Sequence, residues 1–231
     1  MDRKLAANSI AAPAVVCGIG GLALFVGFPL GHLDSVRIDW SESDVLWWDG
    51  LLSFAFFLQH SGMVRRRFQA RVYRSIPPRY RRALYSIASG IALAAVALLW
   101  QRSNHHVLVL GPRFRWVALV PAVCAFALFS WGGLVLRNLD LFGNRAIMAH
   151  AKGTADPPPV FIVRGPYRWV RHPWYVAAIL LFWSCADFTA DRLLFNVLWS
   201  GWVCLGADSR KPTWHTTSAP PTKTTGGRFP C

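Results

Sequence analysis

The stretch Arg164-Gly-Pro-Tyr-Arg-Trp-Val-Arg-His-Pro-Trp-Tyr175 leads directly into an apolar run. Its Gly165-Pro166 pair is a turn signal, and Pro173 suits the first turn of a helix, where its missing N–H is not needed. The stretch therefore predicts a basic loop that brings His172 to the start of a membrane-embedded helix. Arginines and tyrosines beside an apolar segment also serve as interfacial anchors, but the dense group from Arg171 to Tyr175 favours a binding site.

The composition indicates an integral membrane protein. Of the 231 residues, 54% are hydrophobic and only 16% are charged, against about 25% charged residues in an ordinary soluble domain. The formal net charge of +14 would suit a nucleic-acid-binding protein. The basic residues, however, fall in the loops between hydrophobic runs, where membrane topology and lipid headgroups account for them better. We therefore expect a lipid bilayer as partner and no nucleic acid.

The cysteines give no sign of a metal site or a disulfide framework. None forms a C-x-x-C pair, and four of the five lie within apolar segments. Such cysteines are expected to be small buried apolar residues. The five cysteines are Cys17, Cys124, Cys185, Cys204 and Cys231.

Hydropathy predicts an all-α, polytopic membrane protein with about six helical spans. The first four spans cover residues 10–30, 45–64, 83–100 and 116–136. Two further apolar runs, residues 175–185 and 193–205, are shorter than the ~20 residues that comfortably cross a bilayer. They predict a tight helical hairpin with the polar segment 187–192 as its turn.

The chain divides into three parts. Residues 1–44 form an N-terminal anchor and outer loop, residues 45–206 a membrane core, and residues 207–231 a tail. The N-terminus resembles the charged start of a signal peptide, but no small-x-small cleavage site follows the apolar run, which favours a retained anchor. The tail is poor in apolar residues and rich in turn formers, and is predicted to be disordered.

The distribution of positive charge predicts the orientation in an inner (cytoplasmic) membrane. If the spans alternate and both termini are cytoplasmic, 20 of the 25 lysines and arginines fall in cytoplasmic segments. This asymmetry follows the positive-inside rule and places the Arg164–Tyr175 stretch on the cytoplasmic face. The hydrophobic spans show no internal repeat and their polar groups cluster at one face, so a transporter is disfavoured.

Polar groups inside the spans are candidate site residues because they are costly in a bilayer. Asp49 and His60 are eleven residues apart, about three helical turns, and share a helix face. Asp49 is interpreted as reaching the interface. His60 with its neighbours Gln59 and Ser61 is equally compatible with a site. Asp140 has two open roles, a helix-terminal cap or a partner of an arginine in the basic loop.

The motifs of the chain, taken in order, resemble those of the isoprenylcysteine carboxyl methyltransferase-like membrane enzymes. The narrower resemblance is to their NnrU-type branch and, within it, to the methanethiol S-methyltransferase family. It covers roughly residues 45–205. The matching motifs are Gln59-His60-Ser61-x-Met63, Ile76-Pro-Pro78 with Arg82-x-x-Tyr85, Asn138-x-Asp-Leu-Phe-Gly143, Gly165-Pro-Tyr-Arg-x-Val-Arg-His-Pro-x-Tyr175, and Phe182-Trp183 with Asp187-x-Thr189.

The resemblance implies transfer of a methyl group from S-adenosylmethionine to a small thiol such as methanethiol, which gives dimethyl sulfide. It implies His60 as the catalytic group that takes the thiol proton or orients the substrate. Arg168 or Arg171 would clamp the cofactor carboxylate. The other expected cofactor-binding residues are Tyr167, His172, Pro173 and Tyr175, and the expected supporting residues are Gln59, Asn138 and Asp140.

The C-terminal part of the chain leaves a second function open. The resemblance implies a further helix with paired glutamates that complete the site, whereas this sequence has no glutamate after Glu42. The alternatives are therefore a non-catalytic NnrU-type accessory membrane protein and an inactive, C-terminally truncated family member. The sequence leaves the oligomeric state open.

Overall fold

A computed structural model describes residues 3–30, 38–137, 139–154 and 164–208. The described chain is helical apart from two short strands. Its elements are α1 (Arg3–Gly27), α2 (Glu42–Val64), α3 (Arg66–Val72), α4 (Pro78–Leu99), β1 (His106–Val109), α5 (Leu119–Leu136), α6 (Asn144–Ala151), α7 (Pro173–Phe182), β2 (Asp187–Thr189) and α8 (Ala190–Asp208). Short 3-10 turns add η1 (Phe28–Leu30), η2 (Tyr73–Ser75), η3 (Pro112–Ala118) and η4 (Gly165–Arg168).

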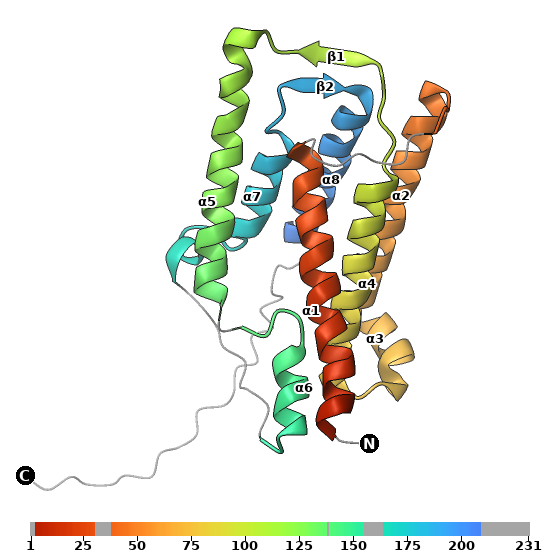
Figure 1. The fold of residues 1–231 in the computed structure, drawn as a ribbon, viewed down its shortest axis with the longest axis vertical. Helices are drawn as coiled ribbons and strands as arrows, with labels where there is room; N and C mark the ends of the chain where they lie inside the picture. Colours follow the sequence, from red (N-terminus) through yellow and green to blue (C-terminus); the bar gives the residue numbers. More distant parts are fainter. Residues whose placement is uncertain (1–2, 31–37, 138, 155–163, 209–231) are drawn as a thin grey trace, which may run out of the picture.

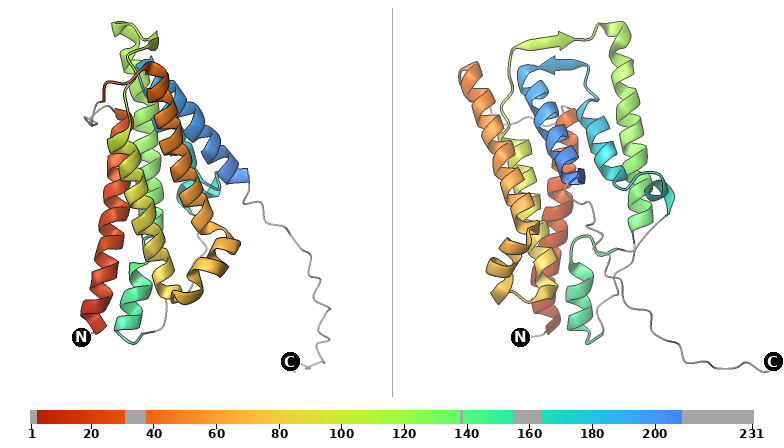
Figure 2. Two further views of the ribbon diagram at one scale, coloured as in Figure 1. Left: turned by 90° about the vertical axis from the view of Figure 1, so that its right-hand side faces the viewer. Right: turned by 180° about the vertical axis from the view of Figure 1, so that it is seen from behind.

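The six main helices alternate in direction along the bundle. α1, α4 and α7 run one way and α2, α5 and α8 run the other (Figure 1). The short helices α3 and α6 lie at the end that holds the N-terminus of α1, and β1 and β2 lie at the opposite end (Figures 1 and 2). The predicted hairpin of the last two helices is present as α7 and α8. We call the two ends the α6 end and the strand end.

Within the described residues, three helical segments are long and apolar enough to cross a membrane, and they indicate an integral membrane protein. They are Ala7–Leu30, Pro78–Leu99 and Pro112–Leu136. α2 has 23 residues but carries polar groups along its length, and α7 has only 10 residues. Six crossings therefore stay a prediction, although the alternating helix directions are those that six crossings require.

Local sequence signals set several helix ends. Ser41 caps α2, because its Oγ accepts a hydrogen bond from the Asp44 N–H at 3.3 Å, and α2 consequently begins three residues before the predicted apolar span. Pro78 and Pro173 are the first residues of α4 and α7, the helix position that proline tolerates. α8 continues to Asp208, two residues past the predicted start of the tail, and residues 209–231 lie outside the described part.

Helices α1 and α4 pack against each other through glycine. A Cβ atom on Gly21 would collide with the Gly90 carbonyl, and one on Gly90 would collide with the Cys17 carbonyl. Small residues allow helix backbones to approach this closely, as at other membrane helix interfaces. The crossing therefore fixes the position of α4 in the bundle.

An aromatic core joins α1, α2, α4, α7 and α8. Its fully buried members include Trp100, Phe182, Phe195 and Trp199. The Phe195 and Trp199 rings stack with centroids 5.3 Å apart. The indole N–H of Trp199 donates to Ser53 Oγ at 3.1 Å, so this buried polar group is paired.

The strand end holds structure that hydropathy did not predict. β1 and β2 form an antiparallel pair, and Arg115 beside them forms a salt bridge with Asp187 at 3.0 Å. Asp49 is fully buried, so the interpretation that it reaches the interface is wrong. Its carboxylate instead accepts a hydrogen bond from the Gln101 N–H at 2.9 Å, directly beyond the end of α4.

A second buried carboxylate, Asp191 at the start of α8, completes this arrangement. It accepts hydrogen bonds from the Ser103 N–H at 3.1 Å and the Trp100 indole N–H at 3.1 Å. Thr189 Oγ1 lies 2.5 Å from the same carboxylate. A cavity of about 490 Å³ adjoins Asp191 and the end of α1.

Candidate functional site

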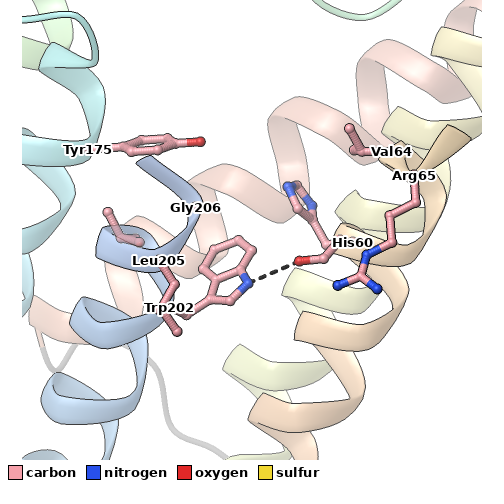
Figure 3. A pocket seen from close by; sticks show the side chains of 9 residues that line it. His60, Val64, Arg65, Tyr175, Trp202, Leu205 and Gly206 are labelled. Atoms are coloured by element: carbon pink, nitrogen blue, oxygen red, sulfur yellow. Dashed lines mark hydrogen bonds between the residues drawn. The ribbon is translucent and has the colours of Figure 1, made fainter. Parts of the chain in front are cut away.

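A cavity of about 630 Å³ lies between α2, α7 and α8. Figure 3 shows its side chains, with α7 on one side, α2 on the other and α8 between them. It unites His60 and Tyr175, which belong to motifs more than a hundred residues apart. The lining residues are His60, Ser61, Val64, Arg65, Tyr175, Trp202, Val203, Leu205 and Gly206.

His60 lies in the last turns of α2 and faces α4 as well as the cavity. The Tyr85 hydroxyl lies 2.7 Å from His60 Nε2 and 3.2 Å from Nδ1. Ser89 Oγ lies 3.2 Å from Nδ1. The rings of Phe56 and Trp202 have centroids 5.1 Å and 5.3 Å from the imidazole. The imidazole is therefore held by hydroxyls from α4 and by aromatic rings from α2 and α8.

Tyr175 forms the opposite wall of the cavity. Its ring stacks on that of His172, with centroids 4.9 Å apart and planes inclined by 24°. Its hydroxyl points into the space between α7 and α2 (Figure 3). His172 supports this wall but does not line the cavity. Pro173 is fully buried at the start of α7, where it fixes the direction in which this helix leaves the loop.

Trp202 links α8 to α2 across the cavity. Its indole N–H donates to Ser61 Oγ at 3.2 Å (Figure 3). Its ring stacks on that of Phe57 with centroids 4.9 Å apart and planes inclined by 9°. Because an indole offers both an apolar face and one N–H donor, Trp202 fastens two helices and still presents a ring to the cavity.

Arg65, the residue after α2, gives the cavity a guanidinium, and among the described lining residues none is acidic. Neither Arg65 nor Trp202 is among the site residues predicted from the sequence. One signal for Arg65 is its position five residues after His60, at the end of the same apolar run. Trp202 has a weaker signal, its three-residue spacing from the core residue Trp199, which puts both indoles on one helix face.

The arginines of the basic loop lie elsewhere. Arg168 and Arg171 are exposed, and neither lines the cavity. Tyr167 is half-buried, and burial raises the pKa of its phenol above the ordinary value, so the phenol stays protonated at neutral pH. The loop brings Pro173 and Tyr175 to α7 and leaves its arginines at the surface.

The loop is fastened to α5 by glycine contacts. Gly165 has a φ of 58°, and a Cβ there would lie 2.8 Å from Val135 Cγ2. One helical turn earlier on α5, a Cβ on Gly132 would collide with the indole of Trp174. The indole of Trp174 therefore fills a notch in the surface of α5, the space left by the missing side chain of Gly132. Since Trp174 lies between Pro173 and Tyr175, this contact helps to set the orientation of the start of α7.

The supporting residues predicted from the sequence have separate places. Gln59 Nε2 lies 2.9 Å from Met63 Sδ, and Gln59 Oε1 is buried without a hydrogen-bond partner among the described residues. Asp140 caps α6, because its carboxylate accepts hydrogen bonds from the backbone N–H groups of Arg145 at 3.2 Å and Ala146 at 3.1 Å. Asn138 lies outside the described residues.

Gly143 follows the fourth span and immediately precedes α6, and its φ of 80° is a left-handed conformation. Asp140 takes the capping alternative, although the helix it caps is the following one. Backbone N–H groups donate to both of its carboxylate oxygens. Asp140 therefore holds the start of α6 and does not line the cavity.

Comparison with known proteins finds similarity over most of the chain. The methanethiol S-methyltransferase of Pseudomonas sp. (strain GM41(2012)) is 30% identical over 188 residues, which are 81% of this chain and 72% of that protein. The methanethiol S-methyltransferase of Mycobacterium tuberculosis is 30% identical over 157 residues, covering 64% of this chain and 61% of that protein.

Nurim of Xenopus laevis is similar at a lower level, with 26% identity over 173 residues, 68% of this chain and 57% of its own length. The chain thus spans about two thirds of the length of these relatives or somewhat less. No family model matches the sequence, and no solved structure matches it.

Proposed function

The chain belongs to the methanethiol S-methyltransferase family, and from this premise we propose that it transfers a methyl group from S-adenosylmethionine to a small thiol such as methanethiol. The observation that carries the proposal is the shared cavity of His60 and Tyr175. These residues come from two motifs that the family resemblance singles out, and the fold makes them opposite walls of one space.

The cavity suits the cofactor in size and chemistry. Its volume of about 630 Å³ lies within the ~300–1,000 Å³ usual for small-molecule and cofactor sites. The sulfonium of S-adenosylmethionine is a cation, and the aromatic faces of Trp202 and Tyr175 attract cations. Its carboxylate would pair with Arg65, whose guanidinium matches a carboxylate in shape and charge.

The residues of the basic loop complete the proposed binding region. His172 sets the ring of Tyr175 by stacking, and Pro173 sets the direction of α7. Tyr167, Arg168 and Arg171 stay proposed cofactor contacts on the family resemblance alone. All three arginines are exposed, but among them Arg65 lines the cavity, so we assign the carboxylate contact to Arg65 in preference to Arg168 and Arg171.

When bound, S-adenosylmethionine supplies an electrophilic methyl group on its sulfonium. The contribution of the chain is to prepare and align the thiol. Among the described lining residues, His60 is the side chain whose ordinary pKa lies near neutral pH. It takes the thiol proton: the S–H bond breaks, an N–H bond forms on the imidazole, and the thiolate keeps the electron pair.

The apolar part of the wall excludes water from the thiolate. Val64, Val203 and Leu205 provide it, and loss of hydration makes an anionic nucleophile more reactive toward a cationic centre. Most of the rate enhancement then comes from alignment of donor and acceptor.

The proposed setting is the inner membrane, with six crossings and both termini in the cytoplasm. The α6 end of the bundle carries the N-terminus, α3 and α6 (Figure 1), and eight arginines lie in residues 65–82. The positive-inside rule places such an end in the cytoplasm, where S-adenosylmethionine is available.

The test is direct. Purified protein in detergent is mixed with S-adenosylmethionine and methanethiol, and dimethyl sulfide is measured by gas chromatography. We expect product from the wild-type chain and product reduced to near background in His60→Ala, with cofactor affinity changed little. Absence of both product and cofactor binding in the wild-type chain would contradict the proposal.

A non-catalytic membrane protein is the second candidate function. Its basis is the resemblance of the sequence motifs to the NnrU-type branch, for which an accessory role is the alternative. An isotherm for S-adenosylmethionine separates the two functions. Binding that is weakened in Arg65→Ala or Tyr175→Ala supports the enzyme, and no binding at all to the wild-type chain supports the accessory role.

A further inference from the structure

One face of α4 approaches the imidazole of His60. Tyr85 and Ser89 are four residues apart, so they stand one above the other on the same side of this helix. The Tyr85 hydroxyl is nearest to Nε2, at 2.7 Å, and Ser89 Oγ is 3.2 Å from Nδ1. Each ring nitrogen therefore has a hydroxyl from α4 within hydrogen-bond distance.

Hydroxyl groups suit both protonation states of an imidazole. The neutral ring has one donor and one acceptor nitrogen, whereas the protonated ring has two donors. A hydroxyl both donates and accepts, so it can rotate to match either state. At the nitrogen that takes up the proton, a carboxylate would pair only with the protonated ring and a backbone N–H only with the neutral ring. His60 can therefore gain or lose a proton without leaving a ring nitrogen unpaired.

The support for these hydroxyls is rigid. Ser89 is 7% exposed and immediately precedes Gly90, whose backbone packs against α1. Aromatic rings confine the imidazole on its other sides, with Phe56 centred 5.1 Å away and Trp202 centred 5.3 Å away. The position of the imidazole ring thus depends on the α1–α4 crossing as well as on α2.

We propose that Tyr85 and Ser89 are positioning residues for the methyl transfer, which hold the imidazole of His60 at the cavity wall and keep both of its nitrogens hydrogen-bonded as it takes up the thiol proton. The S–H bond of the thiol breaks and an N–H bond forms on the imidazole, and the hydroxyl that donated to that nitrogen rotates to accept from it. This inference rests on the function proposed above.

The experiment removes one hydroxyl at a time from α4. Tyr85→Phe and Ser89→Ala are the test variants. Tyr80→Phe and Ser86→Ala are their matched controls, since they make the same changes on the same helix, and Ser86 is also 7% exposed. Dimethyl sulfide formation gives kcat and the KM for methanethiol, and an isotherm gives the affinity for S-adenosylmethionine.

We expect kcat to fall about 10- to 100-fold in each test variant, a part of the 10²–10⁴-fold that a general base contributes. KM and cofactor affinity should stay within about twofold, and both controls should match the wild type. A loss confined to thermal stability, or equal losses in the test and control variants, would overturn the proposal.

A second measurement does not depend on turnover. With ¹⁵N-labelled histidine, His60→Gln identifies the His60 signals among the seven histidines. We expect Tyr85→Phe and Ser89→Ala to change the His60 ring-nitrogen shifts and the tautomer they report, and the controls to leave them unchanged. Unaltered shifts in both test variants would refute the inference. If the chain makes no dimethyl sulfide but these shifts do change, the proposed function fails and the hydroxyl contacts stand.

Discussion

The two ends of the bundle treat buried polar groups differently. At the strand end, the carboxylates of Asp49 and Asp191 accept hydrogen bonds from the backbone N–H groups of Gln101 and Ser103. The Trp100 indole N–H and the Thr189 hydroxyl add to the backbone donor at Asp191. At the cavity, His60 is paired with side-chain hydroxyls. Backbone donors have fixed positions and a fixed role, whereas hydroxyls can rotate and change role. The strand end is therefore built to hold helices together, and the cavity is built to allow a change of protonation.

The largest expected effect is at the cavity. Replacing His60 by alanine removes the proposed base, and we expect the rate of dimethyl sulfide formation to fall about 10²- to 10⁴-fold with little change in melting temperature. His105→Ala, the same change at an exposed histidine, is the control. If His60→Ala lowers the melting temperature strongly but leaves the rate of dimethyl sulfide formation normal, His60 is structural and the contrast between the two ends does not hold.

The next effect is at the strand end and concerns stability. Asp191→Ala leaves the Ser103 N–H and the Trp100 indole N–H without their acceptor, and each unpaired buried donor costs about 1–3 kcal/mol. We expect a clearly lower melting temperature in detergent, with cofactor affinity retained in the protein that remains folded. Asp39→Ala, at an exposed position, should melt like the wild type. Equal melting of the two variants would show that the carboxylate of Asp191 is not structural.

A smaller effect is expected for cofactor binding. Arg65→Ala removes the guanidinium from the cavity wall, and we expect the Kd for S-adenosylmethionine to rise about tenfold, since a hydrogen bond to a charged group contributes ~1.5–3 kcal/mol. Arg67→Ala serves as the control at an exposed neighbour. If Arg168→Ala or Arg171→Ala weakens binding and Arg65→Ala does not, the carboxylate contact belongs to the basic loop.

The smallest effect is expected for the ion pair between Arg115 and Asp187. Their side chains are 56% and 37% exposed, and exposed pairs contribute ~0–1 kcal/mol. Arg115→Ala should shift the melting temperature by no more than about a degree or two, with unchanged activity. A shift as large as that of Asp191→Ala would mean that the β1–β2 pair, and not the buried carboxylates, holds the strand end together.

Sequence reasoning recovered features that depend on nearby residues. The apolar runs and their breaks predicted the main helices and the α7–α8 hairpin. Pro173 predicted the start of α7. Each of these follows from periodicity or from the backbone preference of a single residue.

The contacts of the site depend on which helices become neighbours, and this the sequence did not reveal. Tyr85 belongs to a motif, but the sequence of that motif does not indicate that Tyr85 contacts His60. Arg65 and Trp202 join the cavity because α2 ends opposite α8. Asp140 had two open roles, and the cap of α6 followed only from a short helix that is too polar to detect by hydropathy.

The notch that Gly132 offers to Trp174 has a consequence for how the family can vary. A larger residue at 132 would displace the indole and turn the start of α7, so substitution at either position alone is costly. The two positions, forty-two residues apart and both without chemistry of their own, are expected to change together among related sequences. Coordinated variation at this pair would show that the orientation of the start of α7 is maintained among related sequences.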